Sequence, residues 1–187
     1  MKILQIFGSG RNCGKTTLGC SLLAAFPTVR WIAIKVTPHR HAPVSRPAAD
    51  EKPQHTKDTG RYLAAGAIES YLWSGPPDLM RIASFASRAD GLLLETGYTL
   101  AELPWPLLRL AIGPADPSQW KPGFAERRQR ADAQVLTSAD PSFFLRNGPD
   151  PSAPLLFPFV HTSMLEPALL AFVAAFLVDE PDNNGKR

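Results

Sequence analysis

The stretch GSGRNCGKTT, residues 8–17, has the residue types and spacing of a loop that binds phosphate. Glycines leave room for successive backbone N–H groups to turn inward around phosphate oxygens. Lys15 can reach the β- and γ-phosphates of a nucleotide, and the Thr16 hydroxyl is placed to bind Mg²⁺. Thr17 is expected to support the first helical turn or to contact an α-phosphate. A nucleotide is therefore the first ligand to consider.

The elements that must position this loop flank it directly. An apolar run at 3–7 predicts a buried strand before the loop, and apolar residues from 18 to 26 predict a helix after it. The usual pattern has Gly, four residues and then Gly-Lys-Ser/Thr, but here Ser9 stands where the first glycine is expected. Either Ser9 replaces that glycine or the loop begins at Gly8 and is one residue longer, and we favour the longer loop. The predicted nucleotide contacts in the loop are Gly10, Arg11, Asn12, Cys13, Gly14, Lys15, Thr16 and Thr17.

Composition bounds the size and the class of the protein. A chain of 187 residues with 44% hydrophobic content suits one domain, which we place at 1–178, followed by a flexible tail at 179–187. The net charge of +3 is mild, so the composition does not predict a nucleic-acid partner. The basic cluster at 127–130 is interpreted as a solvated helix face.

The cysteines and the longest apolar run indicate the compartment. Cys13 and Cys20 lie too close together, within the loop and its helix, for a disulfide framework, which favours a reducing cytoplasm. Cys13 beside a helix N-terminus could be a reactive thiol, although a small loop-filling role is favoured. The uncharged run at 168–178 is shorter than the ~20 residues that a membrane span needs. We therefore expect a buried final helix at 166–178 and no membrane contact.

Apolar runs alternate with helix-compatible segments along the chain. This alternation predicts an α/β fold with a mostly parallel sheet of about six to seven strands, flanked by helices on both faces. Pro76 and Pro77 suit the start of a helix that continues through Arg88. The expected strands are 2–7, 30–36, 68–73, 91–95, 107–112, 134–137 and 155–159.

Two irregular segments interrupt this pattern. The first, 37–56, is rich in proline, histidine and charge, and we interpret it as a long active-site loop. The second, 113–124, contains prolines and glycines that oppose regular structure, while Trp120 and Phe124 offer apolar anchors. An anchored loop is the expected form of the second segment.

Polar residues end two of the predicted strands. Ligands of an open parallel sheet bind at the carboxyl ends of its strands, so Lys35 and Glu95 are expected near the phosphate-binding loop. Glu95 follows three leucines, and a carboxylate there needs a partner such as Mg²⁺ or a catalytic water, the alternative being a local turn cap. Lys35 can neutralise a phosphate or carboxylate, or simply lie at the surface. Lys15 and Glu95 are the predicted catalytic residues, and Thr16 and Glu95 the predicted metal ligands.

The histidines and the segment KDTGRYLAAGA at 57–67 are further candidates. His39, His41 and His55 lack the spacing of zinc sites, so contact with an anionic substrate or solvent is favoured over metal binding. In 57–67 we expect a short helix with Asp58 or Thr59 as its N-cap and Gly66 at its end. Its polar residues could also contact phosphate, or a Mg²⁺-bound water in the case of Asp58.

The sequence Thr-Ser-Ala-Asp at 137–140 resembles the Asn/Thr-Lys-x-Asp element with which GTP-binding proteins recognise guanine. Asp140 would accept from the base, although serine stands where lysine is expected. The alternative is a plain turn before Pro141.

Taken together, four elements of the first 98 residues resemble the MobB family of P-loop proteins. They are NCGKTT at 12–17, IKVTPHRH at 34–41, KDTGRYLAAGA at 57–67 and LLLETGY at 92–98. The second element departs from the family's Ile-Lys-His-Thr-His-His, and Thr96 is inserted in the family's Val-Glu-Gly-Phe/Tyr. The resemblance implies GTP binding with Mg²⁺, weak hydrolysis, a homodimer, and assistance to an enzyme that attaches GMP to molybdopterin.

Two other functions stay open. A longer loop and a strand-end lysine also resemble dethiobiotin synthetase, in which ATP would phosphorylate a carbamate with Lys15, Thr16 and Lys35 as the chemical residues. The segment 57–67 is not part of that pattern. The third possibility is a nucleotide-switched adaptor whose loop at 37–56 orders on a partner.

Overall fold

Seven strands form one sheet, and every neighbouring pair in it is parallel. The computed structural model describes residues 1–37, 57–75, 79–137, 155–159 and 165–178. The predicted α/β fold with a parallel sheet is confirmed, and each predicted strand is present within a residue or two of its expected bounds. The strands are β1 (Lys2–Gly8), β2 (Trp31–Thr37), β3 (Glu69–Ser74), β4 (Gly91–Thr96), β5 (Leu107–Pro114), β6 (Ala133–Thr137) and β7 (Leu155–Phe159).

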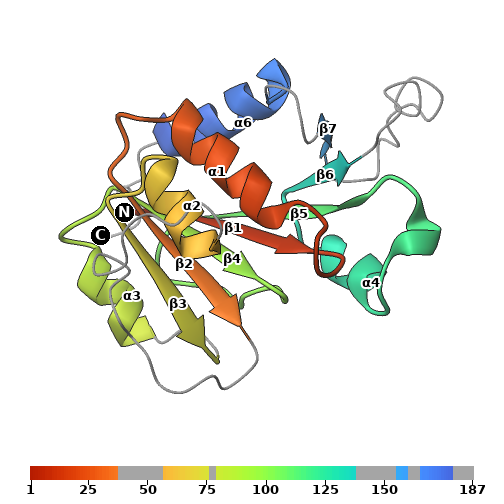
Figure 1. Cartoon of the computed structure of the whole chain (residues 1–187), viewed down its shortest axis with the longest axis horizontal. Coiled ribbons are helices and arrows are strands. Elements are labelled where there is room, and N and C mark those ends of the chain that lie inside the picture. The colour runs from red at the N-terminus through yellow and green to blue at the C-terminus, as the bar shows by residue number, and fades with distance from the viewer. Residues whose placement is uncertain (38–56, 76–78, 138–154, 160–164, 179–187) are drawn as a thin grey trace, which may run out of the picture.

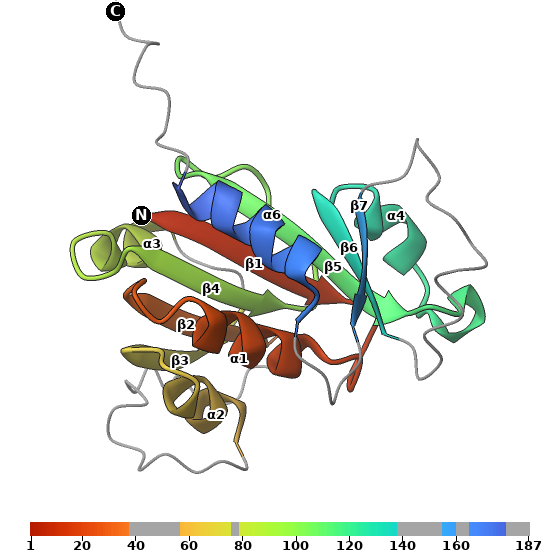
Figure 2. The ribbon, with the colours of Figure 1, turned by 90° about the horizontal axis from the view of Figure 1, so that it is seen from above.

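The strand order changes direction at β1, in the middle of the sheet. The order is β3-β2-β4-β1-β5-β6-β7, and Figure 2 shows β3 and β7 at opposite edges. After β1 the chain builds one half of the sheet with β2, β3 and β4, and then crosses to the other side of β1 with β5. The carboxyl end of β1 is therefore the topological switch point, where open parallel sheets bind their ligands. The loop at 8–17 begins there.

Helices cover both faces of the sheet. Their bounds are α1 (Lys15–Ala25), α2 (Asp58–Ala64), α3 (Leu79–Phe85), the 3₁₀ turn η2 (Pro117–Gln119), α4 (Phe124–Arg128) and α6 (Pro167–Val178) (Figure 1). On one face, Leu22 of α1, Tyr62 of α2 and Leu169 of α6 pack in a single core cluster against the sheet. On the other, Ile82 and Phe85 of α3 pack with alternate residues of the same strands. Phe124 of α4 extends that second layer over Phe7 and Ala111.

Three expectations from the sequence need correction. Helix α2 begins at Asp58, with Lys57 in the N-cap position, so neither Asp58 nor Thr59 is the cap. Of the basic cluster, Arg127 and Arg128 are half-buried and only positions 129 and 130 are exposed, because the segment folds back on the sheet. The final helix was expected to be buried, but only Leu169 and Val173 of α6 are fully so, because one side of the helix packs on the sheet.

The segment 113–124 is an anchored loop, as predicted, and it also contains η2 and the start of α4. The Asp116 side chain caps η2 by accepting from the backbone N–H of Ser118 over 2.9 Å. Trp120 and Phe124 meet edge to face, with 5.4 Å between ring centroids. Within the described residues, no helix has the length and apolar character to cross a membrane.

Candidate functional site

The loop between β1 and α1 is shaped by two left-handed residues and one close approach. Asn12 has φ of 58° and Gly14, which precedes α1, has φ of 94°. At Gly8 a Cβ atom would lie only 2.4 Å from Cys13 Sγ, so this position has no room for a side chain. Ser9, by contrast, carries its side chain in a buried position. The longer loop that begins at Gly8 stays a prediction, since a tight Gly8 and a buried Ser9 fit both alignments.

Lys15 folds back on the loop that it follows. Its Nζ donates to the carbonyl oxygen of Gly10 over 2.6 Å and lies 3.5 Å from Cys13 Sγ. Cys13 Sγ in turn donates to the same Gly10 carbonyl over 3.2 Å. These are local contacts that a phosphate oxygen can replace, since an ammonium gains more from an anion than from a carbonyl. The lysine is thus held directly beside the loop's backbone.

Glu95, at the end of β4, contacts groups from three other elements. The Thr16 hydroxyl of α1 donates to Glu95 Oε2 over 2.7 Å, and Lys35 Nζ of β2 lies 3.0 Å from Glu95 Oε1. The Tyr62 hydroxyl of α2 also donates to Glu95 Oε2. Glu95 is only 2% exposed, so these contacts are what compensates its buried charge.

The sheet register explains why these residues meet. Lys35 on β2 and Ile6 on β1 are the parallel partners of Glu95, so Lys35 and Glu95 lie side by side one residue or two before their strands end. Tyr62 reaches Glu95 from the helix layer above. Burial, followed by the negative charge of Glu95, holds the pKa of Tyr62 well above its usual value, so the phenol keeps its proton and donates.

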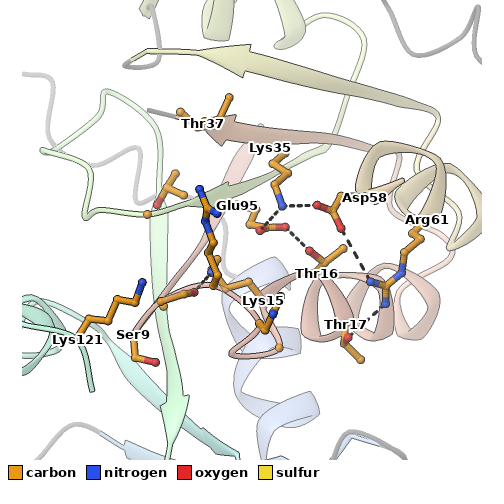
Figure 3. Close-up of a pocket in the computed structure, with 18 of the residues that line it drawn as sticks. Ser9, Lys15, Thr16, Thr17, Lys35, Thr37, Asp58, Arg61, Glu95 and Lys121 are labelled. Carbon is orange, nitrogen blue, oxygen red and sulfur yellow. Dashed lines mark hydrogen bonds and ion pairs between the residues drawn. The ribbon is translucent and has the colours of Figure 1, made fainter. Parts of the chain in front are cut away.

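Helix α2 is joined to the site by an ion pair and by hydrogen bonds. Lys35 Nζ contacts Asp58 as well as Glu95, and Arg61 Nη2 donates to Thr17 Oγ1 over 3.2 Å. Burial would lower the pKa of Lys35, but the charge of Glu95 and the hydrogen bonds to Asp58 and Glu95 outweigh it, so the pKa is raised. The lysine is therefore cationic, and it ties α2 to the end of β4 (Figure 3).

Thr96, the residue inserted after Glu95, has a structural role. Gln5 Nε2, buried on β1, donates to Thr96 Oγ1 over 2.8 Å and to the Tyr98 carbonyl over 2.7 Å. Gln5 Oε1 accepts from the N–H of Leu100 over 3.2 Å. The buried amide thus fixes the turn that follows β4, directly after Glu95.

The phosphate-binding loop, together with Lys35, Asp58, Arg61 and Glu95, lines an open cavity of about 670 Å³ above the carboxyl ends of β1, β2 and β4. Its opposite wall comes from the segment after β5, through Lys121 and Arg127, which the sequence did not indicate. Among the described residues that line the cavity, six side chains are basic and two are acidic, which gives these residues an excess of four positive charges, suited to a polyanion. The basic side chains are Arg11, Lys15, Lys35, Arg61, Lys121 and Arg127; the acidic ones are Asp58 and Glu95.

The structure brings together most of the residues predicted for the site. Gly10, Arg11, Asn12, Gly14, Lys15, Thr16, Thr17, Lys35, Asp58 and Glu95 line the cavity, and Cys13 is buried beneath the loop. Asp140 and the three histidines of the first irregular segment lie outside the described residues, as does that segment beyond Thr37. Among the described residues, no group of three or more His, Cys, Asp and Glu side chains could hold a metal ion.

Tyr62, Gln5 and the opposite wall of the cavity were not predicted from the sequence. Tyr62 lies four residues after Asp58, and residues with that spacing share a helix face, so the helical pattern could have indicated it. Gln5 sits in the middle of an apolar strand, and a polar residue at a fully buried position is a signal that it has hydrogen-bonding partners.

The strand order, the loop at the switch point and the carboxylate on the strand next to β1 define the fold as that of a P-loop NTPase. No model of a known protein family matches the sequence, and no curated protein sequence matches it either. Solved structures do match. Hydrogenase maturation factor HypB from Archaeoglobus fulgidus aligns with a TM-score of 0.58 at 17% identity, over 95% of this chain and 90% of that chain.

Two further structures agree with this assignment of the fold. Bacillus subtilis MobB aligns with a TM-score of 0.54 at 18% identity, over 96% of this chain and 100% of that chain. HypB from Helicobacter pylori, solved in complex with nickel, aligns with a TM-score of 0.54 at 15% identity, over 95% and 85% of the two chains. At such identities the similarity establishes the fold and leaves substrate and partner open.

Proposed function

We propose that this protein binds a purine nucleoside triphosphate with Mg²⁺, with GTP as the preferred nucleotide, and hydrolyses it slowly. The observation that carries the proposal is the direct contact between the Thr16 hydroxyl and the Glu95 carboxylate, 2.7 Å apart beside the phosphate-binding loop. Threonine at this loop position and a strand-end carboxylate are the two oxygen ligands that a Mg²⁺–nucleotide complex requires from the protein. Both face the cavity from different elements.

The donor set fits Mg²⁺ by its chemistry. Mg²⁺ binds oxygen ligands, keeps several waters and takes only one or two protein carboxylates, and here one hydroxyl and one carboxylate meet. Thr16 and Glu95 would hold the ion, and when bound it would neutralise charge on the phosphate oxygens. Glu95 also holds Lys35, so the carboxylate keeps a charged partner whether or not it faces an ion.

The chain's own groups would supply the remaining phosphate contacts. The N–H groups of residues 10–17 and the start of α1 offer donors and a positive dipole end to the phosphates. Lys15 would exchange its Gly10 carbonyl contact for the β- and γ-phosphates and stabilise the charge of the transferring phosphoryl group. Glu95 is also the candidate for positioning the attacking water, and its engagement by three other side chains is consistent with slow turnover.

The biological role that we propose is that of a MobB-type accessory protein in molybdenum cofactor biosynthesis, acting as a homodimer with a molybdopterin-processing enzyme. The support is the order of four sequence elements, each of which contributes residues to the cavity within the described chain. The similarity of fold to MobB, and to a hydrogenase maturation factor, agrees with an accessory role in metal-cofactor assembly.

A nucleotide-switched adaptor is the second candidate. It is favoured by the attachment of α2 to the site through the Lys35–Asp58 pair and the Arg61–Thr17 hydrogen bond. If phosphate and metal change the partners of Lys35 and Thr17, α2 would lose its anchors. For the synthetase-like alternative, ATP would have to be preferred and Lys35 would have to leave both carboxylates.

Titration calorimetry of the full chain with GTP, ATP and their diphosphates, with and without Mg²⁺, tests the proposal. We expect Mg²⁺-dependent binding of triphosphates with a preference for guanine that Asp140→Ala abolishes. A preference for ATP with phosphorylation of a diamino acid would favour the synthetase. Failure of every nucleotide to bind would overturn the proposal in all its forms.

A further inference from the structure

Two lysines contact the same residue of the phosphate-binding loop. Lys15 Nζ donates to the carbonyl oxygen of Gly10 over 2.6 Å. The stem of Lys121 also lies against Gly10, since Cε of Lys121 is 3.0 Å from the point that a Gly10 Cβ would take. Lys121 therefore reaches the cavity next to the phosphate cradle, from a segment more than a hundred residues further along the chain.

The segment that carries Lys121 is held in place by its neighbours. Trp120 Nε1 donates to the Pro114 carbonyl over 2.8 Å, which closes the loop just before Lys121. Arg128 lies over the Trp120 ring, 4.4 Å from its centroid. Immediately after, Phe124 is 2% exposed and fills the core against β1 and β5. The position of Lys121 is thus set by packing on both sides.

Arg127 joins Lys121 on this wall of the cavity. Its Nε is buried and has no hydrogen-bond partner among the described residues. In the part of the chain that the structure describes, neither Arg127 nor Lys121 forms an ion pair. A partly buried guanidinium whose Nε has no partner keeps hydrogen-bonding capacity that an anionic ligand can use.

The carboxylates of the cavity cannot serve this wall. Asp58 contacts Lys35 and lies 4.0 Å from Arg61, while Glu95 contacts Lys35, Thr16 and Tyr62. Figure 3 shows Lys121 near Ser9, on the other side of the cavity from Asp58 and Arg61. The cavity therefore has one wall in which charges are matched and another that is purely basic.

We propose that Lys121 and Arg127 form a second oxyanion subsite, which binds a phosphate group beside the one held by the loop. This inference rests on the proposed function in that it places a nucleotide in the loop. Two sources supply the same chemistry: the terminal phosphate of the nucleotide, or a phosphate group on the second ligand of the reaction. In either case Lys121 and Arg127 donate charge-assisted hydrogen bonds to the oxyanion.

The experiment compares the full wild-type chain with Lys121→Gln/Arg127→Gln and with the control Arg130→Gln, which removes an exposed charge from the same segment. One arm measures, with Mg²⁺, the affinities for GDP and for a non-hydrolysable GTP analogue by calorimetry. The other titrates inorganic phosphate into the GDP-loaded protein. We expect the double variant to lose about tenfold or more in at least one arm, from the loss of charge-assisted hydrogen bonds, while the control changes in neither.

The two arms distinguish the source of the phosphate. Loss of affinity for the analogue, with or without loss of inorganic phosphate binding, assigns the subsite to the terminal phosphate, because phosphate added to the GDP-loaded protein can occupy that position. Loss of inorganic phosphate binding alone assigns it to the second ligand. The inference is overturned if both arms stay within twofold of the wild type, or if GDP is weakened as much as the analogue.

A failure of the proposed function would leave the subsite testable. If the wild-type chain binds no nucleotide, inorganic phosphate is titrated into Lys15→Ala protein, in which the loop lysine is gone. Phosphate binding that persists there and disappears when Lys121→Gln and Arg127→Gln are added supports the subsite. Absence of phosphate binding to the Lys15→Ala protein rejects it.

Discussion

The hydroxyl of Thr16 and the carboxylate of Glu95 form a 2.7 Å hydrogen bond that joins the first turn of α1 to the end of β4. They are 79 residues apart in the sequence. The contact exists because β4 inserts between β1 and β2 and so ends beside the loop that starts α1. The strand order of the sheet therefore sets the distance between the two candidate metal ligands.

Replacing Glu95 with glutamine should weaken the effect of Mg²⁺ on nucleotide binding. The amide keeps the shape and can still accept from Thr16, but it lacks the charge that attracts the ion. We expect the Mg²⁺-dependent gain in triphosphate affinity to fall about 10–100-fold, while binding in EDTA is retained or improved. Calorimetry with and without Mg²⁺ measures this, and Glu102→Gln at an exposed position is the matched control. Equal losses with and without Mg²⁺ would make the role of Glu95 structural.

Lys15→Ala should remove phosphate affinity and leave the fold intact. Among the described residues, the hydrogen bonds of the Lys15 side chain go only to its own loop, at Gly10 and Cys13, so its loss costs little packing. We expect triphosphate affinity to fall by at least about tenfold, and the free energy of unfolding to change by less than about 1 kcal/mol. Calorimetry and urea unfolding check the two parts, with Arg130→Gln as the control for charge. An unfolded variant would show that the loop lysine is structural.

The sheet could be predicted because its strands are nearly continuous apolar runs, as expected for strands covered on both faces. Lys35 and Glu95 could be predicted as neighbours for a related reason: the carboxyl ends of parallel strands share one edge of a sheet. Nothing in the local pattern fixed their order, however. Lys35 and Glu95 form an ion pair because β2 and β4 are neighbours in the sheet and the two residues are partners in its register.

Lys121 and Arg127 could not be predicted to line the cavity, because their position depends on a fold-back that local patterns do not encode. The prolines and glycines of 113–124 correctly indicated irregular structure. The direction of the loop is instead set by tertiary contacts, namely the Trp120–Pro114 hydrogen bond and the packing of Phe124. For the same reason, the sequence predicts a solvated helix face for the basic cluster at 127–130, although Arg127 and Arg128 are half-buried.

Gly91→Ala should destabilise the sheet next to the site. Gly91 begins β4, and an added Cβ would lie 2.5 Å from ring atoms of Trp31, which is itself buried with 1% exposure. The ring cannot move without disturbing the core, so we expect a loss of about 1–3 kcal/mol in the free energy of unfolding, measured by urea titration.

Gly97→Ala is the matched control for this substitution. It follows β4, and an added Cβ there would meet nothing within 4 Å. Its expected change is within about 0.5 kcal/mol. If the two alanine variants unfolded at the same urea concentration, the close contact between Gly91 and Trp31 would be contradicted.

The Cys20 thiol should titrate at unusually high pH. Burial raises its pKa, opposed by the charge of Arg61 and assisted by those of Glu95 and Asp58, from 9.0 to about 11. A raised pKa means that the proton is held more tightly, so the reactive thiolate is about a hundredfold scarcer at pH 8 than for an ordinary cysteine. In a Cys13→Ser background, the alkylation rate by iodoacetamide should therefore rise tenfold per pH unit from pH 8 to about 10.5, where an ordinary thiol levels off above pH 9.

The same measurement also reports on the charges of the site. If burial alone raised the pKa of Cys20, substitutions of the nearby charged residues would not change it. Asp58→Asn removes a negative charge that raises the pKa of Cys20, so the rate should level off at lower pH. Arg61→Gln removes the positive charge that lowers it and should shift the profile the other way. A wild-type profile that levels off near pH 9 and is moved by neither substitution would contradict the placement of Cys20 beside this ion-pair network.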